Sequence, residues 1–251
     1  MEIELPETIK EMLGEDYAII HRDGIAIGKV LDSVELLSMG AEAYIFKAKF
    51  MGVDAIIKWR FPKPYMPKEL DMQLRRYRTE LEAKIIWKAL SIGVKAPTPL
   101  FTDLKECFLI MTYVNGENFR DVVGIIDDEK LCSLTRTIGF YAGILHKNNI
   151  VHGDLTTSNA IVGKDAVYII DFGLSTISKR IEDKAIDIHI FFRSVESAHS
   201  RFEELMKRCF VDGYRDAVGE DTANKVLNAV KNIRLRGRYI AERKLKSEWV
   251  L

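Results

Sequence analysis

The residue pattern of this chain changes character about half-way along. Between Val34 and Lys58, β-branched and aromatic residues dominate two strand-length runs, YIFKAKF and VDAIIKW, separated by a turn at Met51-Gly52. Between Asp127 and Lys147, apolar residues recur at helical spacing, and most of the chain after residue 173 has the same character. This order predicts an α+β protein whose antiparallel-sheet first half joins a mainly helical second half near Val114 to Gly116.

The first 33 residues have their own pattern. PETIKEML predicts a short helix, in which Thr8 and Glu11 have the spacing of a capping box. The alternating run YAIIHRDGIAIGKV predicts two strands that turn at Asp23-Gly24. We therefore expect three parts, with 1–33 as an N-terminal extension, 34–114 as a first lobe and 115–251 as a second lobe with a basic tail.

Composition excludes several classes of protein. The 37 basic and 37 acidic residues cancel, so no overall charge favours nucleic acid or membrane binding. No apolar run approaches the roughly 20 residues that span a bilayer. The 3 cysteines are widely spaced and form no CxxC pair, which favours free thiols in a reducing compartment over a disulfide framework or a zinc site. We expect a cytoplasmic protein that does not contact a membrane.

Two motifs in the second half contain the groups that phosphoryl transfer uses. HGDLTTSN places Asp154 and Asn159 five positions apart, and IIDFG places Asp171 one predicted hairpin later. Asp154 is the candidate catalytic residue, because a carboxylate orients the attacking hydroxyl and accepts its proton. Asn159 and Asp171 are the candidate Mg²⁺ ligands, because Mg²⁺ prefers hard oxygen atoms. For either motif alone, a turn cap or an ordinary strand-end carboxylate is the alternative.

The first half contains candidate groups for binding a nucleotide. LLSMGAEAYIF lies between two predicted strands and keeps only the central glycine, Gly40, of the kinase pattern GxGxxGxV. Its small residues would let backbone N–H groups approach phosphates, although Glu42 makes the loop unusually acidic and a plain hairpin turn is the alternative. Lys58 ends the next strand, where a cation could reach the α- and β-phosphates. Glu82, rather than Glu80, could hold it from a helix predicted over residues 70–92, whereas a solvated surface lysine is the alternative.

Taken together, these motifs resemble the protein-kinase-like superfamily over residues 34–240. More specifically, several segments resemble the atypical serine/threonine kinase and ATPase family of the KEOPS complex. These segments are KWRFPKPYMPKELD, LIMTYVNGENFRD, HGDLTTSNAIV, IDFGLS, EDKAIDIHIF and RLRGR. The resemblance implies a bilobal protein-kinase-like fold with an antiparallel-sheet N-lobe and a reduced, mainly helical C-lobe. It implies ATP and Mg²⁺ as cofactors and a role in threonylcarbamoyladenosine modification of tRNA. It also implies two partners, a Kae-type threonylcarbamoyl transferase subunit and a small regulatory subunit on the N-lobe.

The same resemblance assigns roles to individual residues. Lys58, paired with Glu82, would contact the ATP phosphates, and Met111 would be the gatekeeper beside adenine-binding backbone groups of Thr112 and Val114. Asp187 would brace the catalytic loop through backbone hydrogen bonds. The expected nucleotide-binding set is Met39, Gly40, Ala41, Glu42, Ala43, Ile45, Lys58, Glu82, Met111, Thr112 and Val114.

Other features bear on the phosphate acceptor. Asp187 follows Gly173 by only 14 positions and no APE motif intervenes, so there is little room for a peptide-docking segment. Gly153 and Thr156 stand where most protein kinases have arginine and lysine, which predicts slow transfer to protein hydroxyls, with water as another acceptor. A basic cluster between Lys231 and Lys246 could contact the phosphate backbone of tRNA, and a solvated helix face is the alternative.

Two other functions are alternatives to the KEOPS-type kinase. Small-molecule kinases of the aminoglycoside and choline kinase type share HGD loops, but they usually carry a large helical insertion, and only about 75 residues follow the DFG motif here. A nucleotide-binding scaffold without catalysis is the second alternative. The presence of all the phosphotransfer residues makes that scaffold the weakest of the three hypotheses.

Overall fold

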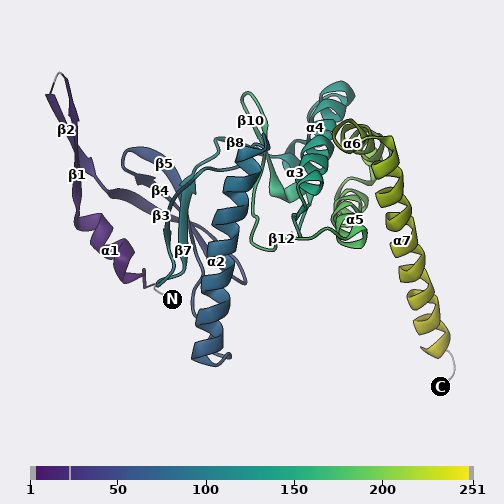
Figure 1. Ribbon diagram of the computed structural model, residues 1–251, viewed down its shortest axis with the longest axis horizontal. Coiled ribbons are helices and arrows are strands. Elements are labelled where there is room, and N and C mark those ends of the chain that lie inside the picture. Colours follow the sequence, from purple (N-terminus) through teal and green to yellow (C-terminus); the bar gives the residue numbers. More distant parts are fainter. Residues whose placement is uncertain (1–3, 23, 249–251) are drawn as a thin grey trace. The chain divides into compact units, whose positions relative to one another are not determined.

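The computed structural model describes the backbone of residues 4–22 and 24–248 and the side chains of residues 4–20, 22 and 24–236 (Figure 1). The chain divides into two compact units. Residues 1–87 and 97–114 form the first unit, and residues 88–96 and 115–251 form the second. The three-part division that the sequence suggests stays a prediction.

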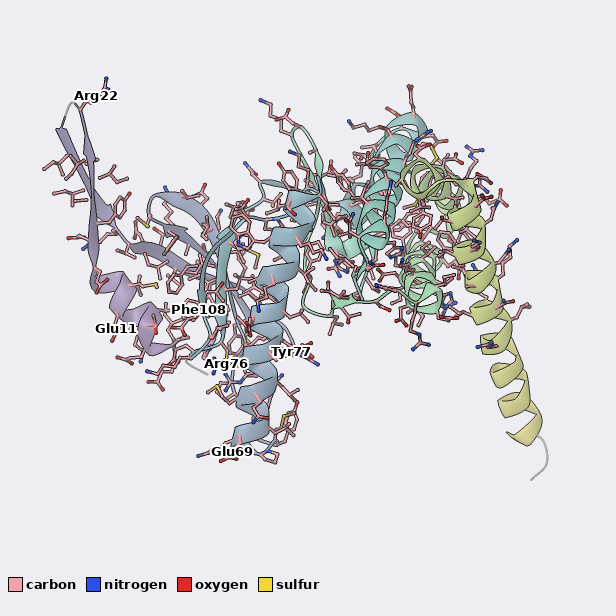
Figure 2. The ribbon with its side chains drawn as sticks, in the orientation of Figure 1. Glu11, Arg22, Glu69, Arg76, Tyr77 and Phe108 are labelled. Atoms are coloured by element: carbon pink, nitrogen blue, oxygen red, sulfur yellow. A yellow bond between two sulfur atoms is a disulfide. The ribbon has the colours of Figure 1, made fainter. Side chains whose placement is uncertain are left out.

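An antiparallel five-stranded sheet forms the centre of the first unit (Figure 1). Side chains that alternate along its central strands enter the core, where Phe46, Ile57 and Phe108 are buried. Phe108 is labelled in Figure 2. Helix α1 (Glu7–Gly14) adds Ile9 to this core. In spatial order the strands are β3 (Leu31–Met39), β4 (Tyr44–Phe50), β5 (Val53–Trp59), β7 (Phe108–Thr112) and β6 (Pro99–Asp103).

The N-terminal residues follow the predicted pattern of elements, with one correction. Strands β1 (Asp16–His21) and β2 (Gly24–Lys29) pair in antiparallel fashion as predicted, and Asp23 of the predicted turn lies outside the described residues. The expected capping box is wrong, because α1 has Pro6 at its N-cap and no side chain caps it. The Thr8 hydroxyl instead donates to Asp103 Oδ2 at 2.9 Å, a contact across the fold that local spacing could not reveal.

A long helix, α2 (Lys68–Ser91), follows β5 and runs beside the sheet in Figure 1. It matches the helix predicted over residues 70–92 to within two residues at either end. The prolines of the preceding segment, FPKPYMP, keep that segment out of the sheet, because proline cannot donate a ladder hydrogen bond. As a result Glu82 and Arg75 come from one continuous helix.

The second unit consists mainly of helices, with short strands between them. The α+β architecture expected from the sequence, with an antiparallel sheet in the N-terminal part and a helical C-terminal part, is therefore confirmed. Its strands and short helices are β8 (Gly116–Asn118), α3 (Phe119–Val122), β9 (Ile150–Val151), η1 (Thr157–Asn159), β10 (Ala160–Gly163), β11 (Val167–Ile169), β12 (Thr176–Ile177) and η2 (Ser200–Phe202). Its long helices are α4 (Asp128–Lys147), α5 (Ile181–Ala198), α6 (Glu203–Val218) and α7 (Glu220–Glu248).

Helices α4 and α6 pack with their backbones in close approach. A Cβ added at Gly139 would lie 2.0 Å from the Phe210 carbonyl oxygen, and one at Gly213 would lie 1.9 Å from that of Arg136. Glycine at these positions is therefore a packing requirement, because any side chain would force the helices apart.

The prediction of free thiols is wrong for two of the three cysteines. Cys132 on α4 and Cys209 on α6 form a disulfide with their Cα atoms 5.3 Å apart, and only Cys107 is free and buried. The two cysteines are 77 positions apart in the sequence, and only the packing of α4 on α6 brings them together. Among the described residues, no helix combines the length and apolar character needed to cross a membrane.

Candidate active site

The HGDLTTSN motif begins directly after β9 and extends through η1 of the second unit, and one buried carboxylate holds it. Asp187 on α5 accepts hydrogen bonds from the backbone N–H of His152 at 2.6 Å and of Gly153 at 2.8 Å. Both carboxylate oxygens are used, so the loop is tied to α5 at two consecutive peptide groups. The bracing role expected of Asp187 is confirmed.

Asp187 is itself supported by a buried chain of side chains from two other helices. His146 Nε2 on α4 lies 3.1 Å from Asp187 Oδ2, and His146 Nδ1 lies 3.0 Å from the hydroxyl of Tyr214 on α6. Burial alone would raise the pKa of the Asp187 carboxyl, but the hydrogen bonds from the His146 ring and the His152 backbone N–H outweigh it and lower the pKa. Burial, with the Asp187 charge, raises the pKa of Tyr214, so its hydroxyl stays protonated and can donate to His146.

Gly153 is required by the backbone rather than by the reaction. Its φ is +83°, and a Cβ there would lie 2.2 Å from the Leu174 carbonyl oxygen. An arginine at this position, as in most protein kinases, would clash with the chain that follows the DFG motif. The glycine that looks like a lost phosphate contact in the sequence is therefore a consequence of how closely these two segments pass.

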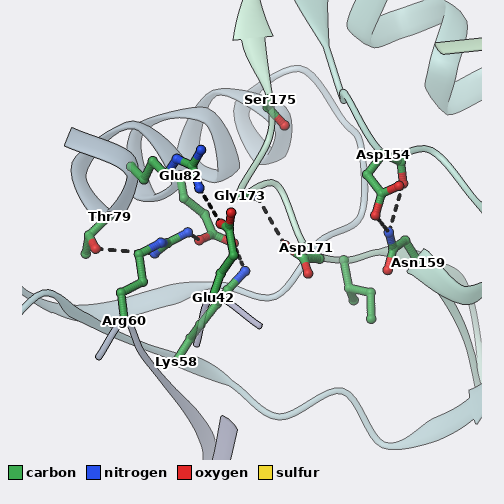
Figure 3. A network of polar contacts seen from close by, with 12 residues as sticks. Glu42, Lys58, Arg60, Thr79, Glu82, Asp154, Asn159, Asp171, Gly173 and Ser175 are labelled. Carbon is green, nitrogen blue, oxygen red and sulfur yellow. Dashed lines mark hydrogen bonds and ion pairs between the residues drawn. The ribbon is translucent and has the colours of Figure 1, made fainter. Parts of the chain in front are cut away.

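Asp154 and Asn159 contact each other directly (Figure 3). Asn159 Nδ2 donates to Asp154 Oδ2 and to the Asp154 backbone carbonyl, both at 2.8 Å. Because both contacts use the amide nitrogen, the Oδ1 atom of Asn159 is the one that could face a cation. The contact between the two side chains orients the Asp154 carboxylate, and both residues belong to the same short loop.

Asp171 is placed by the hairpin of β10 and β11. Ala160 pairs with Ile169, and the Ile170 N–H donates to the Asn159 carbonyl at 3.0 Å, so Asp171 follows directly after the residue bonded to Asn159. Asp171 has a φ of +60°, which is uncommon outside glycine, and its Oδ1 accepts the Gly173 N–H at 3.2 Å (Figure 3). The left-handed backbone turns an exposed carboxylate away from the strand direction.

His152 links these two segments, a role that the sequence reasoning missed. Its ring is fully buried, with Nδ1 3.3 Å from the Asp154 N–H and Nε2 3.1 Å from the Ile170 carbonyl oxygen. A backbone N–H can only donate, so Nδ1 is the acceptor and Nε2 carries the proton. Neutral His152 thus joins the residue that carries Asp154 to the residue that precedes Asp171.

In the first unit, the expected ion pair between Lys58 and Glu82 is present. Lys58 Nζ lies 2.9 Å from Glu82 Oε1, and both side chains are buried. The pair belongs to a larger network that sequence reasoning missed, in which Arg60 Nη2 lies 2.5 Å from Glu82 Oε2 and Arg60 Nη1 donates to Thr79 (Figure 3). Alternation along the strand could have signalled it, since residues two apart share a face.

The loop Gly40–Ala43 connects β3 to β4 as a tight turn in which the Gly40 N–H donates to the Ala43 carbonyl at 3.0 Å. Two contacts tie the loop to residues further along the chain. Lys63 donates to the Ala41 carbonyl, and Arg78 of α2 pairs with Glu42. Of the flanking candidates, Met39 is exposed at the end of β3, and Ile45 on β4 stands opposite Lys58 on β5.

The expected hinge residues lie at the end of β7 and directly after it. Met111 is buried and stands opposite Ile56, and the Thr112 N–H donates to the Thr98 carbonyl at 2.9 Å. Because that N–H is occupied, Thr112 could offer adenine only its carbonyl oxygen. Val114 is partly buried at the end of the first unit.

The candidate metal and RNA sites are less fully defined. No cluster of three or more His, Cys, Asp or Glu side chains suited to a metal occurs among the described residues. Asn159 and Asp171 do supply hard oxygen atoms of the kind that Mg²⁺ binds. In the basic cluster, Arg234 Nη2 pairs with Glu196 Oε1 at 2.6 Å, and the side chains of Arg238, Arg243, Lys244 and Lys246 lie outside the described residues.

A solved structure with the same general fold is the Rio2 kinase complex with ADP, Mg²⁺ and phosphoaspartate from Chaetomium thermophilum. The two chains superpose with a TM-score of 0.58 over 90% of this chain and 83% of the other, at 16% sequence identity. The fold is therefore that of the protein-kinase-like class.

Sequence comparisons identify the family within that class. The family model of the RIO domain matches residues 50–209. The KEOPS complex subunit Bud32 of Pyrococcus abyssi is 36% identical over 217 residues, which cover 82% of this chain and 96% of the relative. A probable serine/threonine-protein kinase Bud32 homologue of Archaeoglobus fulgidus is 35% identical over 74% of this chain and 89% of its own length. The chain belongs to the RIO domain family and, within it, to the Bud32 kinases.

A third relative is larger. The probable bifunctional tRNA threonylcarbamoyladenosine biosynthesis protein of Methanocaldococcus jannaschii is 38% identical over 206 residues, and the match covers 82% of this chain but only 37% of that protein. The rest of the bifunctional protein lies outside the region that matches this chain.

Proposed function

We propose that this chain is an ATP- and Mg²⁺-dependent atypical serine/threonine protein kinase and ATPase, and a subunit of a KEOPS complex that supports threonylcarbamoyladenosine modification of tRNA. The observation that carries the proposal is the Asp154–Asn159 pair, held by the two backbone contacts of Asp187 in a chain of the Bud32 family. That arrangement fixes a carboxylate beside an amide oxygen, which phosphoryl transfer requires.

The residues of the second unit would act on the acceptor and the metal. Asp154 would orient the attacking hydroxyl and accept its proton, while Asn159 Nδ2 keeps the carboxylate in place through its 2.8 Å contact. Asn159 Oδ1 and the Asp171 carboxylate would hold Mg²⁺, which when bound neutralises charge on the phosphate oxygens. His152 would keep the two segments in register without contacting substrate.

The residues of the first unit would bind the nucleotide. Glu82 holds the Lys58 ammonium at 2.9 Å, which would present a fixed cation to the phosphates. Adenine would meet the Thr112 carbonyl and backbone groups of Val114, with Met111 beside it. The remaining members of the set, Met39, Gly40, Ala41, Glu42, Ala43 and Ile45, would cover the nucleotide.

The names of the relatives support the assembly partners. The Pyrococcus abyssi relative is a KEOPS complex subunit, and the Methanocaldococcus jannaschii relative joins a Bud32-like part to further sequence in one chain. We propose a Kae-type transferase subunit and a small regulatory subunit on the N-lobe as partners, in the cytoplasm. Exposed basic residues at the start of the tail, such as Arg236, would contact tRNA phosphates.

The proposal is tested by following phosphate release from ATP by the purified chain, alone and with the transferase subunit and tRNA. We expect hydrolysis that rises in the presence of the partner and falls to background in Asp171→Ala. Asp165→Ala, in the exposed turn between β10 and β11, is the matched control. ATP consumption that requires a small-molecule acceptor would replace the proposal with a small-molecule kinase.

Contact with tRNA is tested separately. Replacement of Arg234, Arg236 and Arg238 by alanine should weaken tRNA binding and reduce its dependence on salt concentration, because fewer counterions are released. Affinity that is unchanged at two salt concentrations would remove the tRNA contact while leaving the ATPase assignment in place.

A further inference from the structure

A pocket of about 220 Å³ lies in the first unit, between the Gly40–Ala43 loop, the segment after β5 and the N-terminal half of α2. It is lined by four basic side chains, Arg60, Lys63, Arg75 and Arg78, and by two acidic ones, Glu42 and Asp71. Four positive charges against two negative ones leave an excess of two. The excess stays positive, at one, when Glu82 behind Arg60 is counted as a third carboxylate.

The inner wall of the pocket is rigid and contains an unsatisfied donor. Arg60 and Arg75 are 2% and 8% exposed. Arg75 is fixed by Asp71 Oδ2 at 2.7 Å and by the Arg60 carbonyl at 3.1 Å. Arg60 contacts Glu82 and Thr79, yet its buried Nε has no hydrogen-bond partner among the described residues. A buried guanidinium with an unmet N–H group is uncommon and favours a nearby anion.

The rim of the pocket is closed by the protein's own oxygen atoms. Lys63 donates to the Ala41 carbonyl, and Arg78 pairs with the Glu42 carboxylate. The side chains of Arg78 and Glu42 are 38% and 50% exposed, so their ion pair is a weak surface pair that a better ligand can replace. The pairing with Arg78 also explains why the Gly40–Ala43 loop contains an acidic residue, because the Glu42 carboxylate occupies the position that a bound anion would take.

A guanidinium group can form two parallel hydrogen bonds with the oxygen atoms of a phosphate. A single loop carboxylate at the rim cannot supply such bonds to several cations at once. We propose that this pocket binds a phosphate group, with Glu42 as an internal competitor. Its ligands would be Arg60, Lys63, Arg75 and Arg78. The pocket shares Ala41 and Glu42 with the loop proposed to cover the nucleotide, but phosphate binding in it requires neither ATP turnover nor Asp154 and Asp171.

The test is a titration of the full chain with inorganic phosphate in chloride buffer, followed by calorimetry and by the NMR signals of the arginine Nε–H groups. Three variants are compared: Lys63→Ala with Arg78→Ala, Glu42→Gln, and Arg76→Ala as the control. Arg76 lies on the same helix, is exposed and does not line the pocket (Figure 2). All four side chains lie at the surface or rim, so the variants should keep the wild-type circular dichroism spectrum.

We expect saturable binding that shifts the Nε–H signals of Arg60 and Arg75. The dissociation constant should rise about tenfold in the double variant, as expected for loss of charged hydrogen bonds, and stay unchanged in Arg76→Ala. It should fall several-fold in Glu42→Gln, because the competing carboxylate is removed. The proposal is overturned if phosphate does not saturate these signals, if the double variant matches the control, or if Glu42→Gln binds more weakly.

A second titration distinguishes the source of the phosphate group. A short oligoribonucleotide without terminal phosphates is added to the phosphate-loaded protein. If the RNA displaces phosphate from the wild-type protein and displaces less of it from the double variant, the site is assigned to the phosphodiester groups of RNA. Saturable phosphate binding without displacement by the RNA assigns it to free phosphate or a phosphate monoester.

Discussion

At the scale of single residues, Gly153 shows how a substitution that looks functional can have a packing cause. Its φ of +83° and the 2.2 Å approach of the Leu174 carbonyl exclude any larger residue, whatever the acceptor of the reaction is. The apparent absence of a regulatory arginine thus follows from the close passage of two backbone segments. Asp187, which braces the same glycine, makes this position central to the geometry of the loop.

Gly153→Ala should therefore destabilise the protein more than a positive φ alone would. Gly93→Ala is the control, because Gly93 has a φ of +89° but no atom within 4 Å of a Cβ. We expect a loss of about 1 kcal/mol in the control from the left-handed backbone. Gly153→Ala should lose roughly 2 kcal/mol more from the clash. Urea unfolding measures both, and equal losses would contradict the account.

The Asp187 carboxylate should make stability depend on acid pH. Its folded pKa is below the ordinary value of 3.8, so its contribution is fully present above pH 3.8 and is lost as the pH falls through the folded pKa. Asp187→Asn should lower the free energy of unfolding by roughly 3 kcal/mol at neutral pH. The difference between wild type and variant should shrink below pH 3.8. A difference that stays constant down to the lowest pH at which the protein folds would be inconsistent with this sign.

Tyr214 is expected to position Asp187 through His146. Tyr214→Phe leaves His146 Nδ1 buried without its 3.0 Å partner, which should cost roughly 1–2 kcal/mol of stability. The ring of His146 could then change tautomer, so ATP turnover should fall while the KM for ATP stays near the wild-type value. Tyr77→Phe on the exposed face of α2 is the control. A variant that loses stability with no change in kcat would reduce Tyr214 to a packing role.

At the scale of elements, sequence periodicity predicts most of the fold because it reports local burial. The strand pair of β1 and β2, the runs that form β4 and β5, and the helix over residues 70–92 all follow from alternation or helical spacing. The capping box failed because a partner distant in the sequence, Asp103, competes for Thr8. The prediction of free thiols at Cys132 and Cys209 was wrong for the same reason, a contact between residues distant in the sequence. Only the glycines of α4 and α6 allow the close approach that joins these two cysteines.

The disulfide between α4 and α6 should contribute measurably to stability. In the chain-entropy account, a link across 77 positions contributes about 4 kcal/mol. Replacement of Cys132 and Cys209 by serine should therefore lower the denaturant midpoint, and reduction should do the same to the wild type. The double variant should be insensitive to reductant. A thiol assay on the denatured, unreduced protein checks the pairing, and three reactive thiols would contradict it.

At the scale of the whole molecule, the candidate site was partly predictable from spacing. Asp154, Asn159 and Asp171 could be selected because their motifs have a chemical pattern along the chain. His152 and Tyr214 could not, because each acts through partners from distant elements, such as Ile170 beyond β11 and His146 on α4. Buried polar networks are determined by packing, so they become visible only when the fold is known.

The central claim is that Asp154 is the carboxylate that serves phosphoryl transfer. The most direct measurement is the rate of ATP hydrolysis by wild type, Asp154→Asn and the exposed control Asp165→Asn, each with Mg²⁺ and with excess chelator. We predict that Asp154→Asn lowers kcat by about 100-fold or more, that the control matches wild type, and that the chelator abolishes turnover in all three. Wild-type turnover in a correctly folded Asp154→Asn protein would contradict the claim.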